Sequence, residues 1–130
     1  MLFIHLQMKN LKRGRNVLKD SNRKEFPIAS GVIDYFPDAL IAVANVSFIG
    51  NQQHNPGEPL HWAREKSTDE ADALMRHFVE RGKVDTDGIR HSAKMAWRAL
   101  ALLQKEIELA NWQAREAAQL PTMDSGGIST

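Results

Sequence analysis

The sequence predicts an all-α fold on three observations. Apolar residues recur every three or four positions over residues 40–46 and 89–110, which is the spacing of one helix face. Helix start and stop signals flank these segments, among them Pro37 before the first and Pro121 after the second. No segment of useful length shows the strict alternation of a half-buried strand.

Length and composition place the chain among single-domain globular proteins. With 130 residues, of which 42% are hydrophobic and 25% charged, it suits one domain and is too apolar for a disordered chain. The absence of cysteine excludes a disulfide scaffold, a zinc-thiolate site and a cysteine nucleophile. No apolar run approaches the roughly 20 residues of a membrane helix, so we expect no membrane partner and a cytoplasmic location.

The charge is divided unevenly along the chain. The formal net charge of +1 conceals a basic N-terminal arm, residues 1–25, with seven basic and two acidic residues. This arm is either a solvated segment or a contact with nucleic acid or another subunit, and its few aromatic residues make nucleic acid an unlikely partner. Residues 26–121 form the predicted helical domain, and residues 122–130 a flexible tail.

The first helix and the loop after it occupy residues 37–66. The helix is expected from Pro37, since proline is tolerated in a first turn, to about Gly50, after a short helical turn over residues 31–35. The loop over residues 51–66 is long for a compact domain and carries His54, His61, Trp62, Arg64 and Lys66. Two interpretations stay open: these groups contact a ligand, or Trp62 pins a loop whose charges are solvated.

The second and third helices have clearer boundaries. A capping box, in which Ser67 caps the helix and Glu70 reaches back, predicts the start of the second helix, and Gly82 predicts its end. The third helix is expected over residues 89–120 and ends before a proline. Its apolar stripe consists of Ile89, Ala93, Ala96, Leu100, Leu103, Ile107 and Ala110.

Carboxylates on the first two helices suggest a cation site. Asp69 and Asp72 are three residues apart, which places both on one helix face, an arrangement that holds divalent metals in helical bundles. Asp38 lies in the first turn of the first helix, with Asp34 before it and Asn45 two turns beyond it. Such oxygen ligands suit Mg²⁺ or Mn²⁺. The alternative, acidic residues that favour a helix dipole, explains Asp69 well and Asp72 less well.

A row of cations on the third helix complements these carboxylates. Arg90, Lys94 and Arg98 recur every four residues and so line one side of the helix. Beside a carboxylate pocket they would bind the remaining charge of a metal-bound polyphosphate, whereas alone they would form a solvated face. The sequence contains no GxxxxGK[ST], GxGxxG, HExxH or GxSxG motif, so nucleotide chemistry here would not use a phosphate loop on a sheet.

Three segments, YFPDAL, IGNQQHNPGEPLHWAREKSTDEADAL and DTDGIRHSAKMAWRALALLQ, resemble a phage-associated family, the MazZ-like dATP/dGTP diphosphohydrolases. That family belongs with the all-α, MazG-like nucleoside triphosphate pyrophosphohydrolases, so the resemblance implies a MazG-like helical bundle. It further implies that Asp69 and Asp72 are the catalytic second carboxylate pair. The first pair is not present literally, and Asn45 stands where relatives tend to have glutamate. Residues implied to lie near the nucleotide are Asn51, His54, His61, Trp62, Lys66, Arg90, Lys94 and Arg98.

The resemblance implies a reaction and partners as well. The expected reaction is Mg²⁺- or Mn²⁺-dependent hydrolysis of dGTP, and also dATP, to the monophosphate and pyrophosphate, with dGMP supplied for 2-aminoadenine synthesis in the host cytoplasm during phage infection. A homo-oligomer, dimer or tetramer, is expected, with Trp97, Leu102, Ile107 and Trp112 as candidates for burial. Two alternatives stay open: a non-catalytic α-helical module that binds nucleotide or nucleic acid, and a degenerate relative that binds nucleotide without cleaving it.

Overall fold

The computed structural model describes residues 22–120, a helical domain without a sheet in that range. Its long helices are α2 (Pro37–His54), α3 (Glu70–Val79) and α4 (His91–Gln119). Shorter elements are the 3-10 helices η1 (Arg23–Glu25) and η3 (Arg64–Lys66) and the π-helix η2 (Ala29–Ile33). The only extended pairing among the described residues is an isolated bridge between Val84 and Arg90. The all-α prediction is therefore confirmed.

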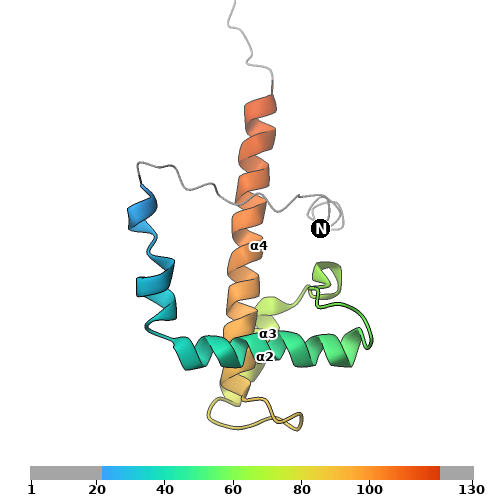
Figure 1. Cartoon of the computed structure of the whole chain (residues 1–130). Coiled ribbons are helices and arrows are strands. Elements are labelled where there is room, and N and C mark those ends of the chain that lie inside the picture. The colour runs from blue at the N-terminus through green and yellow to red at the C-terminus, as the bar shows by residue number, and fades with distance from the viewer. Residues whose placement is uncertain (1–21, 121–130) are drawn as a thin grey trace, which may run out of the picture.

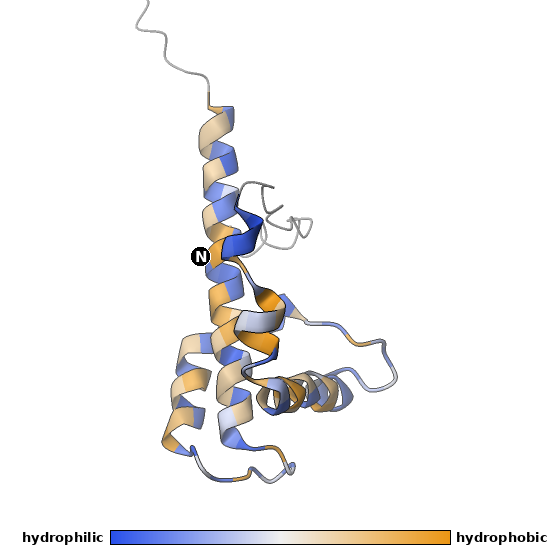
Figure 2. Cartoon of the chain, turned by 60° about the vertical axis from the view of Figure 1, so that its left-hand side comes forward, coloured by the Kyte–Doolittle hydropathy of each residue, from blue (hydrophilic) through white to orange (hydrophobic). Residues whose placement is uncertain are grey.

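Helix α4 is the axis of the described domain (Figure 1). The turn over residues 80–90 joins α3 to α4, and α3 runs back along the N-terminal half of α4. Helix α2 crosses that same half. The C-terminal half of α4 extends beyond α2 and α3 in both views (Figures 1 and 2). The packed part of the domain therefore lies at one end of its longest helix.

Helix α2 begins at the predicted proline but is longer than expected. It continues four residues past Gly50, to His54, so the loop prediction was wrong for its first four residues. No strong helix breaker stands in this stretch, and the helix ends only where Asn55 precedes Pro56, a position that disfavours helical backbone geometry. Asn51 and His54 therefore project from a helix rather than from a loop.

The start of α3 differs from the predicted capping box. The N-cap residue is Asp69, and no side chain caps the helix. Ser67 lies two residues earlier in an extended conformation, and its hydroxyl donates to the Glu70 carboxylate. The prediction was wrong because that carboxylate lies against Lys105 of α4 instead of reaching back to the helix start. Helix α3 also ends three residues before Gly82, which lies in the following turn with φ +85°.

Small side chains form the contact between α3 and α4. The buried apolar residues are Ala73 of α3, Ile89 of the turn, and Ala93 and Ala101 of α4. Alanine lets two helix backbones approach closely, which suits the antiparallel pair. Large apolar side chains of the predicted stripe on α4 remain open to solvent, namely Leu100, Leu103 and Ile107. The stripe is thus buried at its N-terminal end and uncovered beyond it.

The structure does not describe the ends of the chain, and the described residues bear on the membrane prediction. Residues 1–21 of the predicted basic arm and the whole predicted tail, residues 122–130, lie outside residues 22–120. Within residues 22–120, no single helix has the length and apolar character to cross a membrane. Only a pair bent by 87°, Arg23–Ile33 with Pro37–His54, meets those two criteria when taken together.

Candidate functional site

A cavity of about 750 Å³ lies between the C-terminal half of α2, the loop over residues 55–69 and the N-terminal half of α4. Its size falls in the range of small-molecule sites, roughly 300–1,000 Å³. The helix extension described above matters here, because the last two turns of α2 supply one wall. Predicted site residues that line the cavity are Asn51, His54, His61, Trp62, Lys66, Asp69, Lys94 and Arg98.

Four predicted site residues lie elsewhere. Asp34 follows η2, and Asp38 lies in the first turn of α2, whereas the part of α2 that lines the cavity starts at Val46. Asp72 is exposed in the first turn of α3, and Arg90 is the exposed N-cap of α4. Asp38 and Asp72 lie within helices as the sequence predicted, whereas Asp34 follows η2 and Arg90 precedes α4 in extended conformation.

The predicted metal ligands do not gather into one cluster. Among residues 22–120 there is no group of three or more His, Cys, Asp or Glu side chains that could hold a metal ion. Asp69 reaches the cavity wall but is 51% exposed and pairs with Arg76 at 2.8 Å. The hydrogen bond from Arg76 lowers the pKa of Asp69. The described part of the chain therefore does not fit the carboxylate set that a two-metal hydrolase uses.

Two tryptophans bring the loop and α4 together at the cavity. The rings of Trp62 and Trp97 meet edge to face, with centroids 5.5 Å apart and planes at 77°. Trp97 Nε1 donates to Ser47 Oγ of α2 at 2.8 Å, which ties α2 to α4. The Arg64 guanidinium lies over the Trp62 ring, 4.2 Å from its centroid. Trp62 therefore both pins the loop and lines the cavity, so the two interpretations of this loop are compatible.

An ion-pair network fixes the end of the loop on α4. Glu70, only 5% exposed, accepts from Ser67 and lies 3.1 Å from Lys105 Nζ. Lys105 also donates to the backbone carbonyls of Ser67 and Arg64. Arg64 in turn pairs with Glu108, one turn further along α4. A buried carboxylate needs such partners to offset the cost of desolvation, and the result is a loop held at a defined position.

Two cations reach the cavity beside this anchored loop. Arg98 donates to Ser67 Oγ at 2.8 Å and lies 3.8 Å from a Glu70 oxygen, and its side chain is 29% exposed. Lys66 lies at the end of η3, is exposed and also lines the cavity. Together they give this end of the cavity a positive character that suits a phosphate group.

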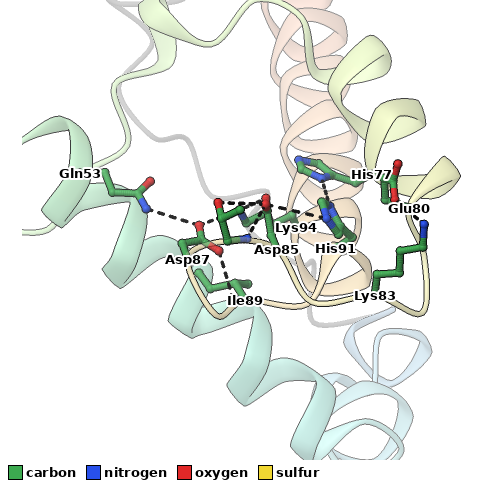
Figure 3. A network of polar contacts seen from close by, with 10 residues as sticks. Gln53, His77, Glu80, Lys83, Asp85, Asp87, Ile89, His91 and Lys94 are labelled. Carbon is green, nitrogen blue, oxygen red and sulfur yellow. Dashed lines mark hydrogen bonds and ion pairs between the residues drawn. The ribbon is translucent and has the colours of Figure 1, made fainter.

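Lys94 has a different environment. Its ammonium lies 2.7 Å from Asp85 and 2.6 Å from Asp87, and Gln53 of α2 donates to Asp87 (Figure 3). Burial alone would lower the pKa of Lys94, but its hydrogen bonds to the two aspartates outweigh burial and raise it. The same contact with Lys94 lowers the pKa of Asp85 to about 2. This group of three charges is net negative, so Lys94 is not a free cation for phosphate.

The turn between α3 and α4 brings further polar residues to the cavity that sequence reasoning missed. Gln53, His77 and Asp87 line the cavity, and Asp85 accepts a hydrogen bond from Lys94. The DTDG segment was used only as part of the family resemblance, and its two aspartates were not predicted to be site residues because their partner Lys94 belongs to the next helix. His77 was missed because its partner lies fourteen residues away in the chain.

Comparison with known proteins identifies the family of this chain. The family model described as "dATP/dGTP diphosphohydrolase, N-terminal" matches residues 18–115, which include every residue that lines the cavity. No curated protein and no solved structure matches the chain. Because the family match spans well over half of the sequence, the chain belongs to the dATP/dGTP diphosphohydrolase family.

Proposed function

We propose that this protein hydrolyses purine deoxynucleoside triphosphates, dGTP and dATP, to the monophosphate and pyrophosphate. The family supplies the substrate class and the type of reaction. The observation that supports the proposal for this chain is the cavity, which is lined by cations and aromatic rings from separate elements. Neither a charge row nor an aromatic loop alone would distinguish a nucleotide site from a solvated surface.

The proposed binding mode follows from the charges of the cavity. Lys66 and Arg98 receive the triphosphate, because they are the cations there that no pair of carboxylates neutralises. Trp62 offers a ring face or edge to the purine, and stacking of a base on an aromatic ring contributes about 1–3 kcal/mol. The polar side chains of Asn51, His54 and His61 on the surrounding walls supply hydrogen bonds to the base and sugar. Lys94 serves the structure of the wall rather than the phosphates.

In the proposed reaction, water attacks the α-phosphorus and pyrophosphate leaves. Asp69, the N-cap of α3, is the predicted catalytic carboxylate that lines the cavity, and Asp72 lies in the first turn of the same helix. Dependence on Mg²⁺ or Mn²⁺ remains a proposal that rests on the resemblance. Because the predicted ligands Asp34, Asp38, Asp69 and Asp72 do not gather among the described residues, we assign no step of the reaction to a metal.

A homo-oligomer, dimer or tetramer, is part of the proposal. Few apolar residues of the described domain are buried, and Leu100 and Leu103 on α4 are 52% and 51% exposed. Exposed apolar residues along a helix that extends past its neighbours favour association with a second copy.

The supply of dGMP for 2-aminoadenine synthesis in a phage-infected host cytoplasm is the context that the MazZ-like resemblance supports.

The test is a panel of dNTPs and NTPs, each with Mg²⁺ and with Mn²⁺, scored separately for pyrophosphate, phosphate and monophosphate. The proposal expects pyrophosphate and dGMP or dAMP in equal amounts, with little turnover of pyrimidine substrates. Binding of dGTP without any product would favour the degenerate relative instead. Release of single phosphates would contradict the assigned reaction.

A further inference from the structure

A row of polar side chains leads from the turn over residues 80–90 to the cavity wall. Asp85 Oδ1 lies 3.9 Å from Nε2 of His91, and Nδ1 of His91 lies 2.9 Å from Nδ1 of His77. Figure 3 shows the His77 ring beside that of His91, while the other ring nitrogen of His77 is directed away from the pair. Of the two histidines, His77 is the one that lines the cavity. The row thus begins at the partly exposed carboxylate of Asp85 and ends at the imidazole of His77, which lines the cavity.

One proton must lie between the two facing nitrogens. At 2.9 Å, Nδ1 of His77 and Nδ1 of His91 form a hydrogen bond only if one of them carries the proton. The Asp85 carboxylate favours the N–H of His91 on Nε2, the side that faces it. In neutral rings this assignment leaves Nδ1 of His91 as the acceptor and places the shared proton on His77. Nε2 of His77, the ring nitrogen directed away from His91, then carries a lone pair.

Burial and the groups around His77 favour this neutral state. Burial lowers its pKa first of all, and the nearby His91, Lys94 and Arg98 of α4 lower it further, against a smaller opposite effect of Asp85. An imidazole whose pKa lies below the ordinary 6.5 is free to accept a proton at neutral pH. Asp85 itself stays ionised, because Lys94 holds its pKa at about 2.

We propose that His77 is the catalytic proton acceptor for the attacking water, with His91 and Asp85 as positioning residues behind it. This inference rests on the proposed function. As the water oxygen bonds to the α-phosphorus, a water proton moves to Nε2 of His77, and the Nδ1 proton of His77 moves to His91. The bond from the α-phosphorus to the bridging oxygen breaks, and its electron pair leaves with pyrophosphate. The imidazolium of His91 faces the Asp85 carboxylate until the proton returns to solvent.

The ion pairs of Lys94 with Asp85 and Asp87 fix the turn over residues 80–90. Asp85 would be free to rotate in an open turn, but Lys94 fixes it, and Asp87 holds the other side of Lys94. Asp87 Oδ1 also accepts the backbone N–H of Ile89 at 3.1 Å, which closes the turn before α4. The two aspartates of the DTDG segment therefore orient the histidine pair through Lys94 and the backbone rather than by contact with substrate.

The test is the pH dependence of kcat/KM for dGTP in three variants. General base catalysis contributes typically about 10²–10⁴-fold, so His77→Gln is expected to lose that much and to lose the fall of activity at acid pH. His91→Gln is expected to lose less and to move the acid limb to higher pH, because the neighbouring His91 ring lowers the pKa of His77. Glu80→Gln, which removes an exposed ion pair with Lys83 on the same turn, is the matched control and keeps the wild-type profile.

A histidine with a purely structural role would change rate or stability without moving the acid limb. His77→Ala provides a further readout, because added imidazoles should restore turnover in proportion to their basicity. If either variant fails to fold, the NMR titration of His77 in the wild-type protein replaces it, and its pKa should match the acid limb. If the wild type turns over dGTP and His77→Gln keeps the same pH profile, the role of His77 is contradicted while the proposed function stands. A His77 pKa clearly away from the acid limb would have the same meaning. Absence of turnover in the wild type would instead contradict the proposed function.

Discussion

Glu70 shows how a single buried charge organises this domain. Its carboxylate is 5% exposed and contacts Ser67 and Lys105, with Arg98 at 3.8 Å. Removing one member of a buried pair costs more than the pair itself contributes, because the remaining charge has no partner. Glu70 thus connects the loop, α3 and α4 at one point. Sequence reasoning predicted only a capping role for it, because its ion-pair partners Arg98 and Lys105 lie on another helix.

We expect Glu70→Ala to lower the free energy of unfolding by about 3–5 kcal/mol, the cost of an uncompensated buried charge at Lys105. Urea unfolding followed by circular dichroism measures it. Asp72→Ala, two residues away and exposed, is the control and should change the free energy of unfolding by less than about 0.5 kcal/mol. Equal effects of the two substitutions would contradict the assignment of Glu70 as the buried hub.

The two predicted catalytic carboxylates can be separated by activity. Asp69 lines the cavity and Asp72 does not, so Asp69→Asn should lower kcat/KM for dGTP more than Asp72→Asn does. Asn preserves size and polarity in both variants, so the comparison isolates the charge. Steady-state kinetics under one metal condition decides the question, and a larger loss in Asp72→Asn would show that the cavity is not where the reaction takes place.

At the scale of elements, sequence periodicity predicted the long helices, but some of their boundaries in the structure differ from the predicted ones. The starts of α2 and α4 fell within two residues of their predicted positions, because Pro37 and the apolar stripe are local signals. The extension of α2 to His54 follows from the absence of a helix breaker before Pro56, whereas the N-cap of α3 lies at Asp69 instead of Ser67 because the Glu70 carboxylate pairs with Lys105 of α4. Contacts such as Lys105 with Glu70, or His91 with His77, join residues far apart in the chain and leave no local pattern.

The turn between α3 and α4 should make stability depend on acid pH. Contact with Lys94 lowers the pKa of Asp85 from 3.8 to about 2, and lowers that of Asp87 as well. Groups with a lowered folded pKa add stability above their unfolded pKa and lose it as pH falls through the folded value. Wild-type stability should therefore fall between about pH 4 and pH 2 more steeply than that of Lys94→Met.

Urea unfolding at a series of pH values measures this difference. Lys83→Met, which removes an exposed lysine paired with Glu80 on the same turn, is the control and should follow the wild-type curve. A Lys94→Met curve parallel to the wild type over that window would show that the two aspartates are not held by Lys94 in solution.

At the scale of the whole molecule, the described domain has less buried apolar surface than its helices offer. The largest buried side chain among its apolar core residues is Ile89, and the others are alanines. Helix α4, with 29 residues, is roughly 44 Å long, far longer than the part that α2 and α3 cover. The fold class was predictable from helical spacing, but the extent of the core was not, because spacing alone does not tell which neighbour covers a stripe.

We expect the protein to be a dimer or tetramer, with the uncovered stripe of α4 in the interface. Leu100→Glu combined with Leu103→Glu should shift the assembly toward monomer, because charges in an apolar interface are costly to bury. Sedimentation or light scattering over a range of concentrations measures the change. Glu106→Gln, on the same helix, is the control. A wild-type protein that stays monomeric at all concentrations would contradict this expectation.

The central claim is that this cavity directs water to the α-phosphorus of a purine deoxynucleoside triphosphate. Hydrolysis of dGTP in ¹⁸O-labelled water, followed by mass spectrometry of both products, tests it most directly. Attack at the α-phosphorus places the label in dGMP and leaves pyrophosphate unlabelled, which is the result we predict. Label in pyrophosphate, or release of labelled single phosphate, would contradict the claim.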